Sequence, residues 1–201
     1  MIRRTIAVGA LLWAVLASGA RAQGNVGLSG NVGVGASIGL VDDISADFSS
    51  GSFKHSDVNG WVDYRFEKSS LLRLTFGSMR IAQTHSQSTV ETPDGPVEVP
   101  LIKERVGYVT VGASYLFWEG WFSSGIFGGI GGYRVTPDEV PPPYTAFADQ
   151  KQTVFGWHFG TEAIFRVYKS SGIVLRLTYH NVSATPHRQF LNANTGAVVR
   201  F

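Results

Sequence analysis

The residues of this 201-residue chain that could do chemistry are a few histidines and carboxylates. His180 and Ser183, with Glu162, could supply the base, nucleophile and acid of a hydrolase. Residues three apart in a regular strand point to opposite faces, however, so His180 and Ser183 would not meet. His158 and Glu162 share one face and could instead be ligands or an acid–base pair. We expect no catalytic residue, with His180, Ser183 and Glu162 as the alternative set.

Other reactive groups are absent or poorly spaced. The chain has no cysteine, which excludes disulfides, thiol catalysis and cysteine-type zinc sites. His55, His85 and His187 lack metal-ligand spacing. Asp42-Asp43 is interpreted as part of a solvated loop, and the proline run 141–143 as a stiff loop. The sequence therefore predicts neither a metal nor a cofactor.

Composition favours strands over helices. Charged residues make up 16% of the chain and aromatic residues 12%, and there are 24 glycines, a mixture typical of glycine-rich strands. The formal net charge of +2 comes with no basic run longer than two residues, which excludes nucleic acid as a partner.

The N-terminus resembles a secretory signal peptide. Arg3 and Arg4 precede an apolar run from Ile6 to Ala17, and Ala20-Arg21-Ala22 forms a small-residue cleavage site. The alternative is a membrane-anchoring helix, but the run falls short of the ~20 residues that a bilayer requires. We expect a signal peptide at residues 1–22 and one domain at residues 23–201.

The mature chain alternates between apolar and polar residues with period 2, the pattern of strands with one apolar face. The predicted strands are Val26–Leu40, Asp57–Glu67, Leu71–Ala82, Val106–Phe117, Trp121–Val135, Thr153–Val167, Ile173–His180 and Leu191–Phe201. Long links (Val41–Ser56, Thr84–Glu104 and Thr136–Lys151) alternate with links of three or four residues. An all-β, eight-stranded antiparallel up-and-down barrel follows, with its three longest links at one end and both termini at the other.

The polar faces of these strands collect charges that cannot face lipid, where arginine or lysine costs about 2 to 4 kcal/mol at mid-depth. The expected lumen network is Asp63, Arg65, Glu67, Arg73, His158, Glu162, Arg166, Arg176, His180 and Arg200. Because five arginines face three acids in this set, we expect a lumen closed by ion pairs with excess positive charge. An eight-stranded interior is just wide enough for its side chains, which favours small and charged residues inside.

The glycine-rich segment Trp121–Val135 does not define its faces clearly. We favour Trp121, Phe127 and Tyr133 on the outer face. The spacing of Trp121 and Tyr133 would then span the ~25 Å apolar band between two aromatic girdles.

The last seven residues, Thr195–Phe201, alternate and end in an aromatic residue. With the whole-chain pattern, this segment resembles the small bacterial outer-membrane β-barrels, the group that includes the OmpA transmembrane domain, OmpX and OmpW-like proteins. The resemblance implies an outer-membrane location with both termini periplasmic, and an assembly signal at Phe201, Val199 and Ala197 that the barrel assembly machinery reads. It also implies contact with outer-membrane lipid and lipopolysaccharide, and an extracellular ligand for the long loops.

Three functions stay open at this point. The first is a non-enzymatic membrane barrel with a structural, surface-interaction or narrow-pore role. The second is a lipid A-modifying esterase, because some eight-stranded outer-membrane barrels are deacylases whose histidine and serine resemble the segment Tyr179–Ser183. The third is a soluble secreted barrel that binds a ligand.

Overall fold

The computed structural model describes residues 31–45, 55–82, 88–92, 95–99, 103–118, 120–139, 151–185 and 187–201. The predicted signal peptide, residues 1–22, lies outside the described residues. The strands are β1 (Val32–Asp43), β2 (His55–Arg65), β3 (Ser70–Ala82), β4 (Ser88–Thr92), β5 (Gly95–Val99), β6 (Lys103–Trp118), β7 (Phe122–Glu139), β8 (Gln152–Tyr168), β9 (Ser171–Val182) and β10 (Arg188–Arg200). No helix in these ranges is long and apolar enough to cross a membrane.

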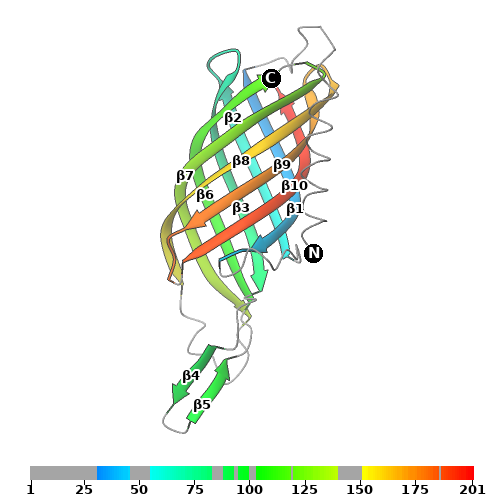
Figure 1. Cartoon of the computed structure of the whole chain (residues 1–201). Helices are drawn as coiled ribbons and strands as arrows, with labels where there is room; N and C mark the ends of the chain where they lie inside the picture. The colour runs from blue at the N-terminus through cyan, green and yellow to red at the C-terminus, as the bar shows by residue number, and fades with distance from the viewer. Residues whose placement is uncertain are drawn as a thin grey trace.

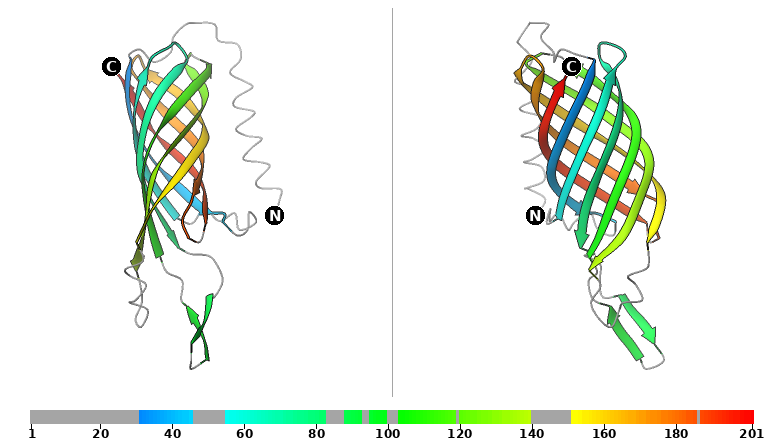
Figure 2. Two further views of the ribbon diagram at one scale, coloured as in Figure 1. Left: turned by 90° about the vertical axis from the view of Figure 1, so that its left-hand side faces the viewer. Right: turned by 180° about the vertical axis from the view of Figure 1, so that it is seen from behind.

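Eight of the strands close into one antiparallel barrel in the order β1-β10-β9-β8-β7-β6-β3-β2 (Figure 1). This confirms the predicted eight-stranded up-and-down barrel. Within the link between β3 and β6, β4 and β5 pair as a separate two-stranded sheet, drawn beyond one end of the barrel in Figure 2. From its sequence this link is predicted to be a polar loop, because two five-residue strands are too short to show clear periodicity.

The two ends of the barrel differ. Short turns join β2 to β3, β6 to β7 and β8 to β9 at the end where β10 finishes, and we call this the short-turn end. The opposite end, where β1 meets the link to β2 and β7 meets the link to β8, is the long-link end. The strands run further into the long links than predicted, since β1 extends to Asp43 and β7 to Glu139.

The register fixes the tilt of the strands. Starting at Gly35, the residues directly opposite one another on successive strands are Trp61, Thr75, Thr110, Gly131, Gly156, Val182 and Arg188. The β1–β10 register, extended two residues past the pair Asp43–Phe190, puts Arg188 opposite Ser45, ten residues from the start. A shear of ten over eight strands corresponds to a tilt of about 40°.

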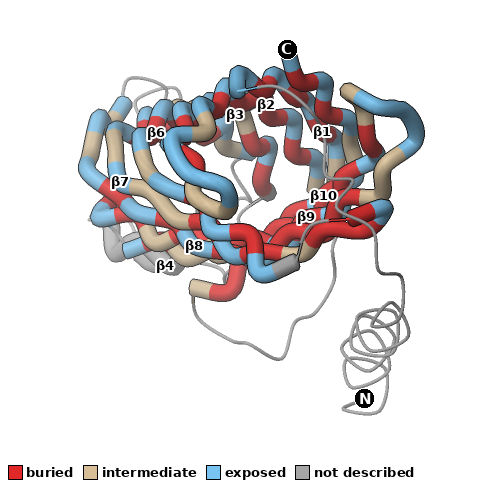
Figure 3. The backbone as a smooth tube through the Cα atoms, turned by 90° about the horizontal axis from the view of Figure 1, so that it is seen from above, coloured by how far each residue is buried: buried red, intermediate tan, exposed pale blue. Residues whose placement is uncertain are grey.

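Buried and exposed residues alternate along the strands of the barrel (Figure 3), as expected when successive side chains point to the lumen and to the outside. The outer face is apolar as predicted, with Ile38 63%, Leu72 53% and Phe117 61% exposed. Exposed aromatic residues gather at the short-turn end, and they include Tyr64, Phe66, Tyr115, Phe117, Trp121, Tyr168 and Phe201.

The faces of β7 contradict one prediction. Phe127 and Tyr133 are buried in the lumen, whereas Ile126 and Ile130 face outward. Only Trp121, which precedes the strand, is exposed, so the expected aromatic span from Trp121 to Tyr133 is wrong. Alternation is uniform from residue 125 onward but shifts next to the turn, where Phe122 and Ser123 are both buried.

Candidate functional site: the filled lumen

Glu162 on β8 is the centre of the polar interior. Arg73 on β3 donates to both of its oxygens, with Nη1 2.9 Å from Oε2 and Nη2 3.0 Å from Oε1. Arg176 donates to Oε2 from Nε at 3.1 Å and from Nη2 at 3.0 Å, and the Ser114 hydroxyl donates to Oε1 at 2.9 Å. Two guanidinium groups and a hydroxyl thus satisfy one fully buried carboxylate, as a charge in a narrow interior requires.

A second acid extends this cluster toward the short-turn end. Asp63 accepts from Nη2 of Arg73 at 3.2 Å and lies 2.9 Å from Nη2 of Arg200. All three side chains are buried. The chain of alternating charges therefore runs from Arg176 through Glu162, Arg73 and Asp63 to Arg200, and it links strands β9, β8, β3, β2 and β10.

Aromatic rings occupy the space beside these charges. The Arg176 guanidinium carbon lies 3.4 Å from the centroid of Trp61 and 4.9 Å from that of Phe127, so the buried cation makes cation–π contacts with both rings. Room for the rings comes from glycines on neighbouring strands. A Cβ at Gly35 would overlap the indole of Trp61, and one at Gly160 would lie 2.8 Å from Phe127.

This pairing of glycines with rings explains why the aromatic residues of β7 are buried in the lumen. Sequence reasoning assumed that large rings belong outside a narrow barrel. The lumen admits them because each lies against a residue without a side chain: Tyr133 against Gly156 and Tyr108 against Gly77. The signal that could have shown this lies between strands, because a glycine of one strand lies against an aromatic residue of the neighbouring strand.

An amide and aromatic layer follows toward the long-link end. Asp57 accepts from Asn59 at 2.8 Å and from Asn194 at 2.6 Å. Further toward the long-link end, the Tyr133 hydroxyl lies 3.0 Å from Nδ1 of His180. The rings of Tyr108 and Tyr133 stack there with centroids 5.5 Å apart.

The long-link end of the lumen is apolar, which the sequence analysis did not predict. Its buried cluster comprises Val41, Met79, Ile81, Val106, Tyr108, Tyr133, Val135, Val182, Ala184 and Phe190. Arg188 lies beside the cluster, 3.6 Å from Asp43 and 3.1 Å from Glu104. The interior toward the short-turn end is thus occupied by ion pairs, and the interior toward the long-link end by apolar side chains with the Arg188 ion pairs beside them.

The structure places most of the ten predicted network residues inward, with exceptions at the short-turn end. Asp63, Arg73, His158, Glu162, Arg176, His180 and Arg200 are buried, while Arg65 and Arg166 are half-buried. Glu67 is exposed in the turn after β2, where it accepts from Ser70 at 3.2 Å, so its assignment to the lumen is wrong. The strand ends two residues before Glu67, and the alternation used to place it no longer applies.

Two further expectations about charge are also wrong. Asp42 and Asp43, taken for a solvated loop, are buried at the end of β1 because the strand continues through them. Excess positive charge is not found either. Among the described residues, the buried acids are Asp42, Asp43, Asp57, Asp63 and Glu162, and the buried arginines are Arg73, Arg176, Arg188 and Arg200.

The hydrolase set is not brought together. Ser183 is exposed just beyond β9, and its backbone N–H donates to the carbonyl of Phe155. His180 is buried, with one ring nitrogen at Tyr133 and the other 3.5 Å from the Asn192 amide. Glu162 is held by arginines. In the part of the chain that the structure describes, no cluster of three or more His, Asp or Glu side chains could hold a metal ion.

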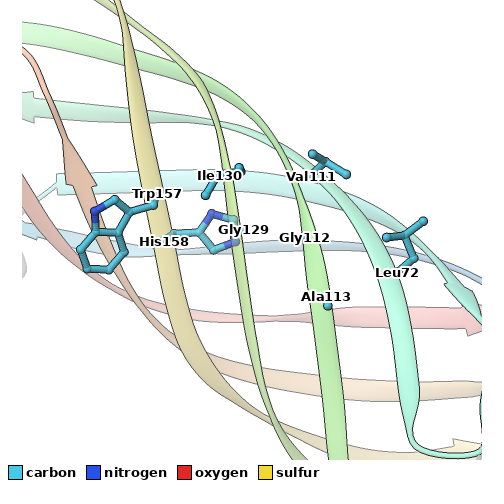
Figure 4. A pocket seen from close by; sticks show the side chains of 8 residues that line it. All are labelled: Leu72, Val111, Gly112, Ala113, Gly129, Ile130, Trp157 and His158. Atoms are coloured by element: carbon cyan, nitrogen blue, oxygen red, sulfur yellow. The ribbon is translucent and has the colours of Figure 1, made fainter.

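A hollow of about 600 Å³ lies in the barrel wall rather than in the lumen (Figure 4). Its lining is Leu72, Val111, Gly112, Ala113, Gly129, Ile130, Trp157 and His158. Leu72, Val111, Ile130 and Trp157 are exposed on the outer face, and His158 is buried close to Gly129. The hollow is therefore a thin, glycine-rich part of the apolar wall, without the converging polar groups of a reaction site.

Comparison with known proteins agrees with this geometry. A family model described as "Outer membrane protein beta-barrel domain" matches residues 8–201. Solved structures with the same fold include Neisserial surface protein A (16% identity, TM-score 0.55, 85% of this chain and 96% of that one). The N-terminal barrel of Pseudomonas aeruginosa OprF (10%, 0.50, 84% and 98%) and P. aeruginosa OprG (10%, 0.50, 89% and 100%) are similar. No curated protein matches the chain.

Proposed function

Because this chain belongs to the outer membrane protein β-barrel domain family, we propose that it is a closed, non-enzymatic barrel that displays its long links at the cell surface. The family and the apolar outer wall place it in the outer membrane. Its role is to hold the links for interaction outside the cell, and it does not conduct solutes.

The occupied lumen is the observation that carries this proposal. Charge-paired side chains fill the half around Glu162, and an apolar cluster around Phe190 fills the half toward the long-link end. Apolar side chains in contact across a lumen leave no continuous polar route for ions. A filled barrel is suited to positioning loops, because the contacts across its lumen brace the strands that carry the loops.

Orientation and partners follow from the two different ends. The short-turn end, with Phe201, Val199 and Ala197 on the outer face of β10, would lie toward the periplasm and present the assembly signal to the barrel assembly machinery. The long-link end would then face outward, surrounded by lipopolysaccharide. An extracellular ligand would meet the links 46–54, 83–102 and 140–150.

An esterase role finds no support in the contacts of His180. Its ring nitrogens are occupied by Tyr133 and Asn192, and Ser183 is exposed whereas His180 is buried. A soluble ligand-binding barrel is opposed by the outer wall, where Ile38, Leu72 and Phe117 are more than half exposed. A wall of this kind suits a lipid environment.

Planar-bilayer recording of the purified barrel tests the proposal, with an open sixteen-stranded porin as the positive control. We expect no steady conductance from the wild-type protein. A matched pair of variants, Phe190→Ala inside the apolar cluster and Phe155→Ala on the outer wall, tests the location of the seal. Leak that appears only with Phe190→Ala supports the proposal, and a large wild-type conductance contradicts it.

A further inference from the structure

Three exposed arginines lie on the outer wall near the long-link end, on strands β3, β6 and β7. Arg80 and Arg105 are directly opposite each other in the β3–β6 register. Arg134 is opposite Gly107, which makes it a diagonal neighbour of Arg105. Directly opposite neighbours have Cβ atoms about 5 Å apart, and diagonal neighbours about 7 to 8 Å apart. Arginine side chains are long enough to reach one anion from these positions.

The strand register puts the three arginines at one level. Because the shear is ten over eight strands, the residue directly opposite on the next strand lies about one and a quarter residues nearer the long-link end. This holds from β3 to β6 and again from β6 to β7. Arg105 is one such step above Arg80, and Arg134 falls between the two because its partner Gly107 is two residues lower. Their Cα atoms therefore share a level to within roughly 3 Å.

This level lies outside the apolar band. Arg105 and the exposed Phe117 are on the same face of β6, twelve residues apart. That separation is about 40 Å along the strand and about 30 Å along the membrane normal at a tilt of about 40°. Since the apolar band is ~25 Å tall, Phe117 at one interface leaves the arginines among the lipid headgroups at the other.

Among the described residues, the positive charges at this level outnumber the acid that pairs with them. Directly opposed like charges destabilise a strand pair, yet Arg80 and Arg105 share one acid. Asp138 lies 3.0 Å from Nη2 of Arg105 and 3.9 Å from Nε of Arg80, whose side chain is 66% exposed. Among the described residues, Arg134 has no ion-pair partner. An external anion is the group that this arrangement lacks.

The geometry points to a binding site for a lipid phosphate formed by Arg80, Arg105 and Arg134, with Asp138 orienting Arg105. Guanidinium groups suit this ligand because each can donate two parallel N–H···O hydrogen bonds to a phosphate group. The inference rests on the orientation proposed above, under which the phosphate is that of lipopolysaccharide. Just below the arginines, Gly132 has open space around its Cβ direction, and the wall there lets the lipid approach the strands closely.

Binding of lipid A to the full-length, detergent-folded protein tests this site. Thermal unfolding is measured against increasing concentrations of diphosphorylated lipid A, fully dephosphorylated lipid A and inorganic phosphate. The test variant is Arg80→Gln/Arg134→Gln, which spares the Arg105–Asp138 pair. The matched control is Lys68→Gln/Lys169→Gln, which removes two exposed charges from the short-turn end.

We expect diphosphorylated lipid A to raise the midpoint temperature of thermal unfolding equally for the wild-type protein and for the Lys68→Gln/Lys169→Gln control. The test variant should need about tenfold more lipid for the same rise, and added salt should weaken the binding. Dephosphorylated lipid A and inorganic phosphate should have little effect. An equal response of the test variant, or equal binding of dephosphorylated lipid A, would overturn the proposal.

The same preparations separate this inference from the proposed function. Conductance does not depend on Arg80 or Arg134, so a closed barrel that ignores lipid A contradicts only the phosphate site. A barrel that conducts ions but binds lipid A through these arginines contradicts only the closed lumen.

Discussion

Arg73 and Glu162 form a bidentate ion pair across the lumen, between two strands that are not hydrogen-bonded to each other. Arg73 is on β3 and Glu162 on β8, and β6 and β7 separate them in the sheet. A contact of this kind braces the barrel across its interior. Because Arg176 and Ser114 donate to the same carboxylate, four strands depend on one acid.

Glu162→Gln should be among the most destabilising conservative changes in the lumen. The amide leaves Arg176 without its ion-pair partner and Arg73 with Asp63 alone, which should lower the free energy of unfolding by about 3 to 5 kcal/mol. Lumen water would reduce this cost. Urea unfolding in lipid vesicles, followed by tryptophan fluorescence, measures the change.

Glu67→Gln is the control for that measurement. Glu67 is exposed in a turn, so its loss should change stability by less than about 0.5 kcal/mol. Equal effects of the two substitutions would show that the pairs at Glu162 contribute no more than surface contacts.

Gly35→Ala tests the packing of rings against glycines. The new methyl group would overlap Trp61, which is buried against Arg176 and cannot move freely, and the cost should be about 1 to 3 kcal/mol. Gly132→Ala is the matched change on the outer face, where a Cβ meets nothing within 4 Å, and it should cost nothing. Adding Trp61→Phe to Gly35→Ala should recover part of the lost stability if the overlap is the cause.

The barrel and most of its faces could be predicted because period 2 persists over eight segments and charges mark the inner face. β7 could not be assigned in this way. Five of its residues are glycine, which suits either face, so the choice depended on Phe127 and Tyr133. Their inward position depends on glycines of a neighbouring strand, which a pattern within one strand does not reveal.

The polar interior was predictable in type but not in extent. Arg73, Glu162 and Arg176 are recognisable because each is a charge within an apolar alternation. Asp57 and Asp43 are at strand ends, where the sequence does not show whether the strand or the loop includes them. Their burial follows from the β1–β2 and β1–β10 registers, which bring Asp57 opposite Gly39 and Asp43 opposite Phe190.

Depth in the membrane should determine the cost of an arginine on the outer wall. Leu74 and Ser78 are both on the outward parity of β3, with Leu74 45% exposed in the apolar band and Ser78 next to Arg80. Leu74→Arg should cost about 2 to 4 kcal/mol and Ser78→Arg about 0 to 1. Unfolding in lipid vesicles gives both values. Similar costs at the two positions would contradict the depth assigned to the arginine level.

Impermeant labelling of single cysteines tests the orientation of the barrel, and the natural absence of cysteine removes background reaction. Thr89→Cys is placed in β4 within the link between β3 and β6, and Lys68→Cys in the turn between β2 and β3. With the long links outside, a maleimide that cannot cross the membrane should label Thr89→Cys on intact cells. Lys68→Cys should react only after the outer membrane is opened, because its turn lies in the periplasm. Labelling of Lys68→Cys alone on intact cells would reverse the orientation, and labelling of both in the medium would indicate a secreted barrel.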